Sequence, residues 1–420
     1  MDMEFFSVHK RPTTTICEGS GPRKRKKKSK DKHQLEHVCE PNDEAQWGDL
    51  DDGVLELVLA RLPVSDFFRF RSVCKGWSSL IRSPSFLTAC SEVSLRGPWF
   101  YMLDSKSDSG VIYDMDVGRW RHISFLSTLT GPGKLIPVAA AGGLICFRSP
   151  NGDLSVCNPL TGSCRELPPL NSVYPIHAIA MHASKSSYRI VVIFGEILKF
   201  GVKVYTSSEK QWVELPVSGS IEDAASKLFE KQTSVPYDDG AYIMAGPSLN
   251  DIRLSMTKEF SAVGGEVIHF LNGNGRVVAC DTRKGTMYSF PAILPPDFEY
   301  SVDIVECRGR VLLVVLLEMM ETATIRVWEF QQAEMEWVQV LAMPPAMSNT
   351  YYGKKADINC VGYGDFIMVC ISSRRFHRVV LCNVTNNLWA ELPRCYVPGS
   401  RKIKRFVSCF CFEPRIEARV

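Results

Sequence analysis

Hydrophobic residues follow a helical period between Trp47 and about Phe86. With Val54 at zero and about 100° per residue, one arc of about 140° holds five apolar side chains, and Leu57 falls outside it. The five are Val54, Val58, Leu62, Leu55 and Leu59. This pattern predicts an amphipathic helix that Pro63 helps to end.

A second apolar arc predicts either one amphipathic helix or two short helices that meet near Lys75 and Gly76. Ser65 or Asp66 can cap its start, because a short side-chain oxygen accepts a hydrogen bond from the unpaired amides of the first turn. The arc contains Phe67, Cys74, Ile81, Phe70, Trp77, Val73 and Leu80.

This helical segment is small for the number of apolar side chains that it carries. About 40 residues lie near the lower limit for an independent core, and Leu57 and Phe68 fall outside the two arcs. Such a surplus is buried either by a partner's groove or helices, or by a neighbouring domain of the same chain. The pattern alone leaves these two alternatives open.

Beyond about Ser91 the period changes to that of short strands, and six stretches repeat one form. Each has an apolar strand, a polar turn and an anchor residue before a closing strand, as in KVYTSSEKQWVEL and VLCNVTNNLWAEL. The anchors are Trp120, Cys164, Trp212, Met287, Trp337 and Trp389, separated by steps of 44, 48, 75, 50 and 52 residues. A repeat of about 50 residues built from short strands is typical of a β-propeller blade.

The repeats favour six blades over seven for residues 91–420. The step of 75 residues predicts an insertion at about 220–240, which either contacts a partner or serves only as a spacer. The anchors are expected to pack each blade on its neighbour, because an aromatic residue that recurs in every repeat serves packing more often than ligand stacking.

Residues 1–46 are polar and charged with almost no periodic apolar residues, so we expect a disordered arm. Residues 21–32 hold eight basic side chains and one acidic, net +7, which leaves 3 − 7 = −4 for the rest of the chain. This acidic remainder argues against a nucleic-acid-binding core. The cluster is typical of a nuclear-targeting signal, of nonspecific polyanion binding or of a solvating tail. It consists of Arg23, Lys24, Arg25, Lys26, Lys27 and Lys28.

The fifteen cysteines are spread singly along the chain, and the N-terminus has no signal-peptide pattern. We therefore expect free thiols in a reducing compartment. The longest aliphatic run, VLLVVLL from Val311, has seven residues. A bilayer requires about 20, so we expect no membrane contact.

A search for catalytic motifs in the sequence finds none. The eight histidines are scattered, and the sequence has no His-Glu-x-x-His, no Cys-x-x-Cys and no Gly-x-Ser-x-Gly. We expect no metal, no cofactor and no active site, and hence a protein that is not an enzyme.

The run WGDLDDGVLELVLARLPVSDFFRFRSVCKGWSSLIRSPSF resembles an F-box, the short three-helix module that docks onto the Skp adaptor of cullin-RING ubiquitin ligases. One departure is Asp51, which stands where the family usually has proline, although acidic residues suit the positive end of a helix. The match rests on Leu50, Val58 with Leu59, Leu62 with Pro63, VCKGW from Val73 to Trp77, and SPSF from Ser83 to Phe86.

This resemblance implies that residues 47–90 form a small all-α F-box module of three helices. It also implies an adaptor-binding surface with its supporting core. We assign to this surface and core Leu50, Val54, Val58, Leu59, Leu62, Pro63, Phe68, Val73, Cys74 and Trp77.

The stretches CNPLTGSCRELPPL from Cys157 and RFVSCFCFEP from Arg405 resemble the kelch-like propellers that follow F-boxes in plant proteins. Cys164 and Met287 depart from the pattern because they replace its tryptophan. The two resemblances together imply a multidomain chain, an all-α F-box followed by an all-β kelch-like propeller.

Such an architecture implies a substrate-recognition subunit of an SCF-type ubiquitin ligase. The Skp adaptor would connect the chain to the cullin and RING subunits, and the propeller would hold a target protein that the sequence does not identify. The alternative is a nuclear scaffold or transcriptional cofactor that binds proteins without promoting degradation; a propeller enzyme ranks last. We expect a nuclear or cytoplasmic location, or both.

Overall fold

The structure is a computed structural model. It describes residues 51–93, 96–104, 110–123, 135–172, 174, 176–184, 186–196, 199–216, 253–258, 266–271, 277–281, 286–291, 293, 300–331, 334 and 336–420. The expected arm at 1–46, with the basic cluster Arg23 to Lys28, lies outside these residues, as do Leu50 and the expected insertion at 220–240.

The N-terminal module contains four α-helices where three were expected. Cys74 is extended, and its Sγ accepts from the Trp77 amide at 3.4 Å, so the second predicted helix is divided. Ser83 caps a further helix that begins with Pro84, a residue whose fixed φ suits a helix start. The helices are α1 (Asp52–Ala60), α2 (Val64–Phe70), α3 (Lys75–Ser79) with the 3-10 turn η2 (Leu80–Arg82), and α4 (Pro84–Glu92).

The described strands form six four-stranded antiparallel sheets, and each anchor residue lies on the last strand of one sheet. Sheet 1 is β24 (Phe406–Phe412), β1 (Trp99–Asp104), β2 (Gly110–Asp114) and β3 (Arg119–Ile123). Sheet 2 is β4 (Ile136–Ala141), β5 (Leu144–Arg148), β6 (Leu154–Cys157) and β7 (Cys164–Glu166). Sheet 3 is β8 (Ile176–Ala183), β9 (Tyr188–Glu196), β10 (Lys199–Thr206) and β11 (Gln211–Leu215).

The chain continues through three further sheets. Sheet 4 is β12 (Arg253–Lys258), β13 (Glu266–Leu271), β14 (Val277–Asp281) and β15 (Thr286–Ser289). Sheet 5 is β16 (Tyr300–Cys307), β17 (Arg310–Met319), β18 (Thr322–Gln331) and β19 (Glu336–Ala342). Sheet 6 is β20 (Asp357–Tyr363), β21 (Phe366–Ser372), β22 (His377–Asn383) and β23 (Leu388–Glu391), preceded by α7 (Pro345–Ser348) and η4 (Asn349–Tyr351).

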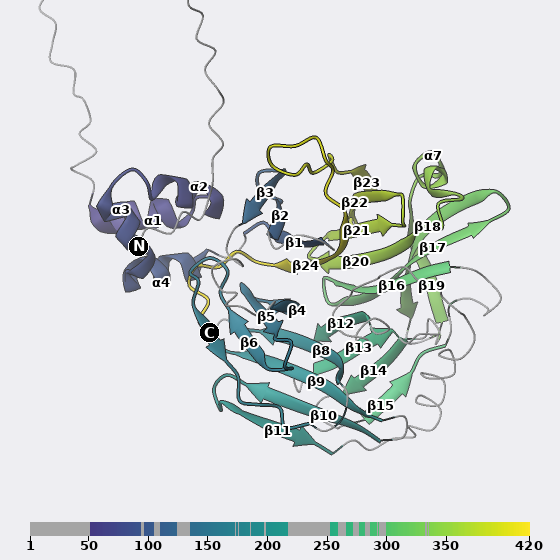
Figure 1. Cartoon of the computed structure of the whole chain (residues 1–420), viewed down its shortest axis with the longest axis horizontal. Helices are drawn as coiled ribbons and strands as arrows, with labels where there is room; N and C mark the ends of the chain where they lie inside the picture. Colours follow the sequence, from purple (N-terminus) through teal and green to yellow (C-terminus); the bar gives the residue numbers. More distant parts are fainter. Residues whose placement is uncertain are drawn as a thin grey trace, which may run out of the picture.

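The sheets close into a ring, which makes the domain a β-propeller (Figure 1). The first strands of successive sheets contact one another in the order β4, β8, β12, β16, β20 and β24, and β24 contacts β4. The C-terminal strand β24 therefore completes the sheet begun by β1, with Trp99 opposite Phe412. Pairing the two ends of the domain in one sheet leaves no open edge at the closure.

A repeated turn leads into the closing strand of four sheets. The residue two positions before the anchor has positive φ, a conformation for which glycine carries no steric cost. These residues are Gly118 (63°), Gly162 (73°), Lys210 (57°) and Asn387 (50°). Asp114, Asn158 and Asn383 open three of these turns and accept hydrogen bonds from the turn amides, which fixes the backbone reversal.

Three anchor tryptophans connect neighbouring sheets through their indole N–H groups. Each donates to the carbonyl of a proline that follows the closing strand of the preceding sheet. The pairs are Trp120 with Pro393 (2.6 Å), Trp212 with Pro168 (2.8 Å) and Trp337 with Pro291 (2.9 Å). Trp389 instead donates to Asn387 of its own turn, and Met287 lies opposite Cys280 on β14.

The two ends of the ring differ in the length of their connections. Neighbouring strands in each sheet run in opposite directions. The connections from the first to the second strand and from the third to the fourth strand of a sheet therefore lie at one end of the ring. The connections from the second to the third strand, and from one sheet to the next, lie at the opposite end. At the first end the β4–β5, β16–β17 and β20–β21 turns have only two residues between strands. At the opposite end the chain runs through 216–252, 343–356 and 392–405 between strands. We call these the helix end and the loop end, since α4 enters β1 at the first.

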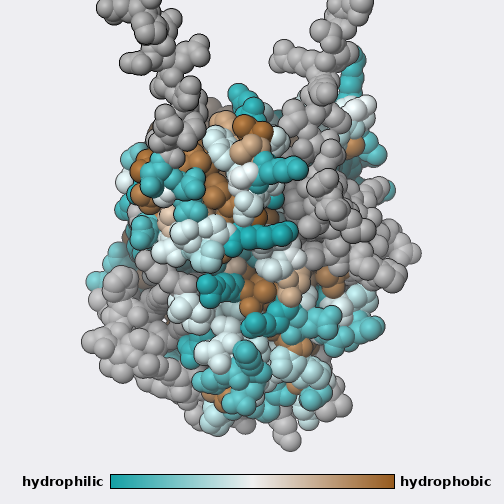
Figure 2. All heavy atoms as spheres, turned by 90° about the vertical axis from the view of Figure 1, so that its left-hand side faces the viewer, coloured by the Kyte–Doolittle hydropathy of each residue, from teal (hydrophilic) through white to brown (hydrophobic). Residues whose placement is uncertain are grey.

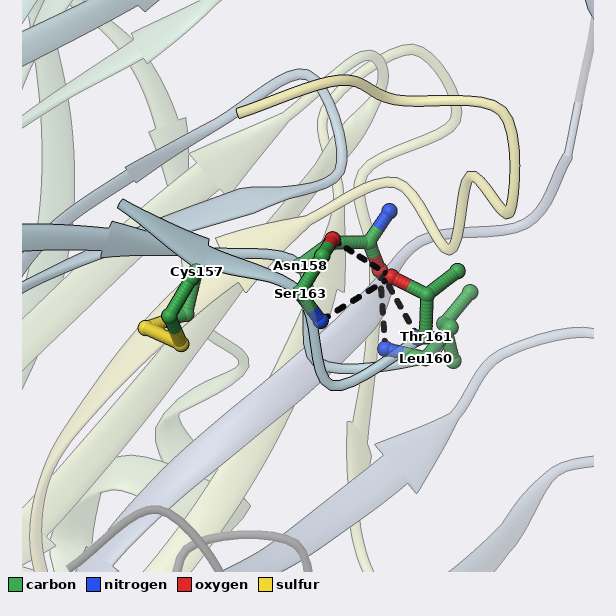
Figure 3. The surroundings of a disulfide bond; sticks show 6 residues. Cys157, Asn158, Leu160, Thr161 and Ser163 are labelled. Carbon is green, nitrogen blue, oxygen red and sulfur yellow. Dashed lines mark hydrogen bonds between the residues drawn. A yellow bond between two sulfur atoms is a disulfide. The ribbon is translucent and has the colours of Figure 1, made fainter.

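Cys157 on β6 and Cys164 on β7 form a disulfide, with Cα atoms 4.1 Å apart (Figure 3). The expectation of free thiols is therefore wrong for this pair, because the antiparallel β6–β7 hairpin places the two residues opposite each other. Ten other cysteines in the described part are not disulfide-bonded. Burial raises the pKa of Cys146, Cys307 and Cys382 to about 12, which keeps these thiols protonated and unreactive.

The C-terminal residues 413–420 lie across the helix end of sheet 2. Asn158, fully buried, donates from Nδ2 to the carbonyls of Arg415 (3.0 Å) and Ala418 (2.8 Å). Its Oδ1 accepts from the amides of Leu160 (2.8 Å) and Thr161 (3.3 Å), and these turn bonds are drawn in Figure 3. One side chain thus joins a turn of sheet 2 to the end of the chain.

The helices share one hydrophobic core with the ring and the C-terminal residues. Phe67, Phe86 and Cys90 contribute from the helices, Trp99, Ile145 and Phe412 from sheets 1 and 2, and Ile416 from the C-terminal residues. Arg96, between α4 and β1, donates to the carbonyls of Ala60 (2.7 Å) and Leu62 (3.4 Å) at the end of α1. The helical module is therefore fixed to the ring rather than tethered by a free linker.

Candidate adaptor-binding surface

Helix α1 begins at a capped residue in the position where an F-box usually has proline. The Asp51 carboxylate accepts from the amides of Gly53 (2.8 Å) and Val54 (3.3 Å). An N-cap of this kind stabilises a helix start by about 1 kcal/mol. Two side-chain hydrogen bonds from Asp51 thus define the start of α1 in place of a proline's fixed backbone.

One edge of α1 presents apolar side chains to solvent. Val54, Leu57 and Val58 are exposed, Val58 by 55%. These three fall within about 100° on the helix circumference, whereas Leu59 on the other side is buried. The predicted arc is thus divided, with one part in the core and the other, extended by Leu57, on the surface.

The chain between α2 and α3 adds further apolar surface. Phe70 at the end of α2 is exposed, and Val73 in the following turn is 63% exposed. The half-buried Trp77 meets Phe70 edge to face, with ring centroids 6.0 Å apart. Figure 2 views the helical side of the molecule and shows hydrophobic residues gathered in its upper part between hydrophilic ones.

Two aromatic residues of α2 support this surface from inside. Phe67 stacks on Phe86 of α4 with centroids 4.9 Å apart. The Arg71 guanidinium lies 5.2 Å from the ring centroid of Phe68. Phe68, which falls outside the two predicted arcs, is only 8% exposed, so it is buried within the chain, which is one of the two expected alternatives. The helical period could not show this, because α4 and the ring supply a second buried side.

The predicted site residues therefore divide into two groups. Leu59 and Phe68 are buried, and Leu62, Pro63 and Trp77 are half-buried. Val54, Val58, Val73 and Cys74 are exposed, and Leu50 lies outside the described residues. The sequence placed Phe70 in the buried arc, yet it is exposed because the helix ends there. The signal that could have shown this is the polar Arg71–Ser72 step before Val73.

Hydrogen bonds and burial hold the module in one arrangement. The Ser83 hydroxyl donates to Glu56 Oε1 at 2.8 Å, which joins α4 to α1. Burial lowers the pKa of Arg71, and nearby Arg82 lowers it further. Burial raises the pKa of Cys90 to about 12, so this thiol carries no charge near neutrality.

The chemistry of the surface suits protein binding. Its exposed members are aliphatic and aromatic, and no group of three or more metal-ligating side chains occurs among the described residues. Within the same residues, no helix has the length and apolar character needed to span a membrane. Exposed apolar side chains grouped on one side of a surface helix, as on α1, are typical of a docking site.

The fold and this surface define a class: an F-box module fixed to a β-propeller. Residues 47–88 match the F-box domain family, and residues 132–347, more than half of the chain, match the KIB1-4 beta-propeller family. The chain belongs to the F-box proteins that carry such a propeller. As a class, these are non-catalytic subunits that recognise substrates for ubiquitin ligases.

Relatives from Arabidopsis thaliana are similar over nearly the whole chain. F-box only protein 13 is 38% identical over 94% of this chain and 90% of its own length. F-box only protein 6 is 28% identical over 94% of this chain and 80% of its own length. F-box/kelch-repeat protein At5g43190 is 21% identical over 83% of this chain and 82% of its own length.

Proposed function

We propose that this chain is the substrate-recognition subunit of an SCF-type ubiquitin ligase. Its helical module binds a Skp-family adaptor, which connects it to the cullin and RING subunits. The loop end of the propeller binds a target protein and holds its lysines near the ubiquitin-carrying enzyme. The chain then contributes proximity and orientation rather than a chemical step.

The observation that carries this proposal is the exposed apolar edge of α1, formed by Val54, Leu57 and Val58, together with the exposed Phe70 and Val73 at and after the end of α2. These side chains lie on a module whose own core is already complete, since Leu59, Phe67 and Phe86 are buried. An apolar edge that the described part of the chain leaves exposed favours a partner.

The placement of this edge also supports the proposal. The helical module packs at the helix end of the ring, and the long connections lie at the loop end. Long loops on a rigid frame are the usual carriers of specificity. An adaptor on the helices and a target on the loop end would not compete for surface.

The test is co-purification with a Skp adaptor. We expect Val54→Glu with Val58→Glu to weaken adaptor binding at least about tenfold, because each buries an unpaired charge in the interface. The matched control, Val213→Glu with Leu388→Glu, introduces two glutamates at exposed apolar positions on closing strands of the propeller. It should bind the adaptor as the wild type does. An adaptor that binds neither wild type nor control would refute the ligase proposal and leave the scaffold function.

Nuclear entry through Arg23 to Lys28 is part of the same proposal. Replacing these six residues with alanine should shift a fluorescent fusion towards the cytoplasm, and an unchanged distribution would remove the signal's role.

A further inference from the structure

Two neighbouring connections at the loop end concentrate positive charge. They are the β21–β22 turn, residues 373–376, and the β23–β24 connection, residues 393–405. Their sequences, SRRF and PRCYVPGSRKIKR, contain seven Arg and Lys residues and no Asp or Glu. We call these segments the basic loop pair. Its exposed cations are Arg374, Arg375, Arg394, Arg401, Lys402 and Arg405.

The basic loop pair has a defined structure. Tyr396 and Ile403 pair as an antiparallel bridge, and the Val397 amide donates to the Lys402 carbonyl at 2.8 Å. The resulting hairpin carries Arg401 and Lys402 near its tip, in the loop drawn between β23 and β24 in Figure 1.

The hairpin is anchored at its base and joined to the adjacent turn. Trp120 of sheet 1 donates to the Pro393 carbonyl at 2.6 Å, and Cys395 and Phe406 are buried in the core between sheets 6 and 1. Arg405 Nη1 donates to the Arg374 carbonyl at 3.5 Å. The cations are thus presented together by a preformed surface, which lowers the entropic cost of binding.

Among the described residues, no acidic group neutralises these charges. Across the part of the chain that the structure describes, none of the six exposed cations makes an ion pair. The acidic residue at the end of β23, Glu391, already pairs with Arg378 at 2.8 Å. Gathering like charges in one place raises the local potential and attracts anions.

Apolar and aromatic groups lie within the same hairpin. Tyr396 is 50% exposed, and its bridge partner Ile403 is exposed as well. Tyrosine and arginine are enriched in protein interfaces, since each combines apolar contact with hydrogen bonding. A partner that fits this surface carries carboxylates and also apolar side chains.

We propose that the basic loop pair binds an acidic segment of a partner protein. This deepens the proposed function, because it names a place on the loop end and the chemistry of what binds there. A protein segment fits better than a nucleic acid: outside residues 21–32 the chain carries a net charge of −4, so the positive potential is local. A long polyanion would extend beyond the patch into regions of the opposite sign.

The test uses the full chain and a labelled short polyglutamate peptide, measured by fluorescence anisotropy at low and at physiological ionic strength. The test variant is Arg401→Glu with Lys402→Glu. The matched control is Arg119→Glu with Lys210→Glu, which changes the net charge equally at exposed cations of the helix end. We expect the Kd of the test variant to rise at least about tenfold, and that of the control by less than about twofold.

The outcomes distinguish the proposal from its competitors. Equal loss in the test and control variants would show an effect of net charge alone and overturn the patch. Preferential binding of a short DNA duplex of equal charge, lost in the same test variant, would replace the protein partner with a nucleic acid. Failure of the wild type to bind polyglutamate at low ionic strength would also overturn it. Co-purification of the test variant with the Skp adaptor tests the ligase proposal independently. Because Arg401 and Lys402 lie at the loop end, adaptor binding should be unchanged in this variant whether or not the basic loop pair binds the peptide.

Discussion

Replacement of the buried Asn158 tests whether one side chain holds the C-terminal residues to the ring. Asn158→Ala removes two donated bonds, to the Arg415 and Ala418 carbonyls, and two accepted bonds, from the Leu160 and Thr161 amides. Each such bond stabilises the fold by about 0.5 to 1.5 kcal/mol, so the expected loss is about 2 to 6 kcal/mol.

Asn383 provides the matched control. It opens the corresponding turn of sheet 6, and its Oδ1 accepts from the amides of Thr385 (3.0 Å) and Asn386 (3.1 Å). Asn383→Ala removes only these two local bonds, so we expect a loss of about 1 to 3 kcal/mol. The difference between the two variants reports the bonds that reach the C-terminal residues.

Asn158→Asp separates the donors from the acceptors. The carboxylate keeps the turn bonds but faces the carbonyl oxygens of Arg415 and Ala418 without a proton to donate. Burial should raise its pKa above the usual value of about 3.9. The folded state then binds the proton more tightly than the unfolded state does. The loss in free energy of unfolding relative to wild type should therefore shrink as pH falls through the folded-state pKa of the carboxyl introduced in Asn158→Asp, and grow as pH rises through it.

Urea unfolding followed by tryptophan fluorescence measures these differences, and amide hydrogen exchange at residues 413–420 locates them. Exchange there should accelerate in Asn158→Ala and remain unchanged in Asn383→Ala. If Asn158→Ala is no less stable than Asn383→Ala, and exchange at residues 413–420 is unaltered, then Asn158 does not hold these residues to the ring.

Three further predictions concern single sites. Gly143 has φ of 86°, and an added Cβ would lie 2.7 Å from Arg415 Cβ, so Gly143→Ala should lower the Tm more than Gly399→Ala, where φ is 72° and no atom lies within 4 Å. Trp212→Phe loses the 2.8 Å bond to Pro168 and should cost about 1 kcal/mol in urea unfolding, while an unchanged midpoint would show that ring packing alone joins sheets 2 and 3. After reduction, the denatured chain should have two more titratable thiols than before reduction, and Cys157→Ser should show no such increase. If the wild type shows no increase either, the Cys157–Cys164 bond is ruled out.

The repeated sheets were predictable because their signals are local. A residue of positive φ lies two positions before the anchor in four of the turns, and the anchor itself lies on the closing strand. Such patterns recur within a few residues and are visible along the sequence. Pairing of β24 with β1 joins the two ends of the domain, and no short-range pattern encodes it.

The helical module was predicted less completely for a related reason. The periodicity showed which residues are apolar but not which of them the rest of the chain covers. It therefore left open whether Phe68 is buried within the chain or by a partner, and it gave no sign that Phe70 is exposed. The disulfide was missed because the expectation of a reducing compartment was applied to every cysteine, although the Asn158 turn places Cys157 opposite Cys164. Tertiary contacts decided each of these positions.

The core shared by the helices and the ring determines when during synthesis the helices can complete their packing. The helices are synthesised before the strands, yet their core contains Phe412 on β24 and Ile416, which leave the ribosome after all the other strands of the ring. The helices therefore reach their final packing only after β24 and Ile416 have been synthesised. A product truncated before β24 lacks both this packing and the closing strand. Premature stops should therefore yield unstable fragments that are degraded. They should not yield shortened chains that bind the adaptor without a target-binding domain.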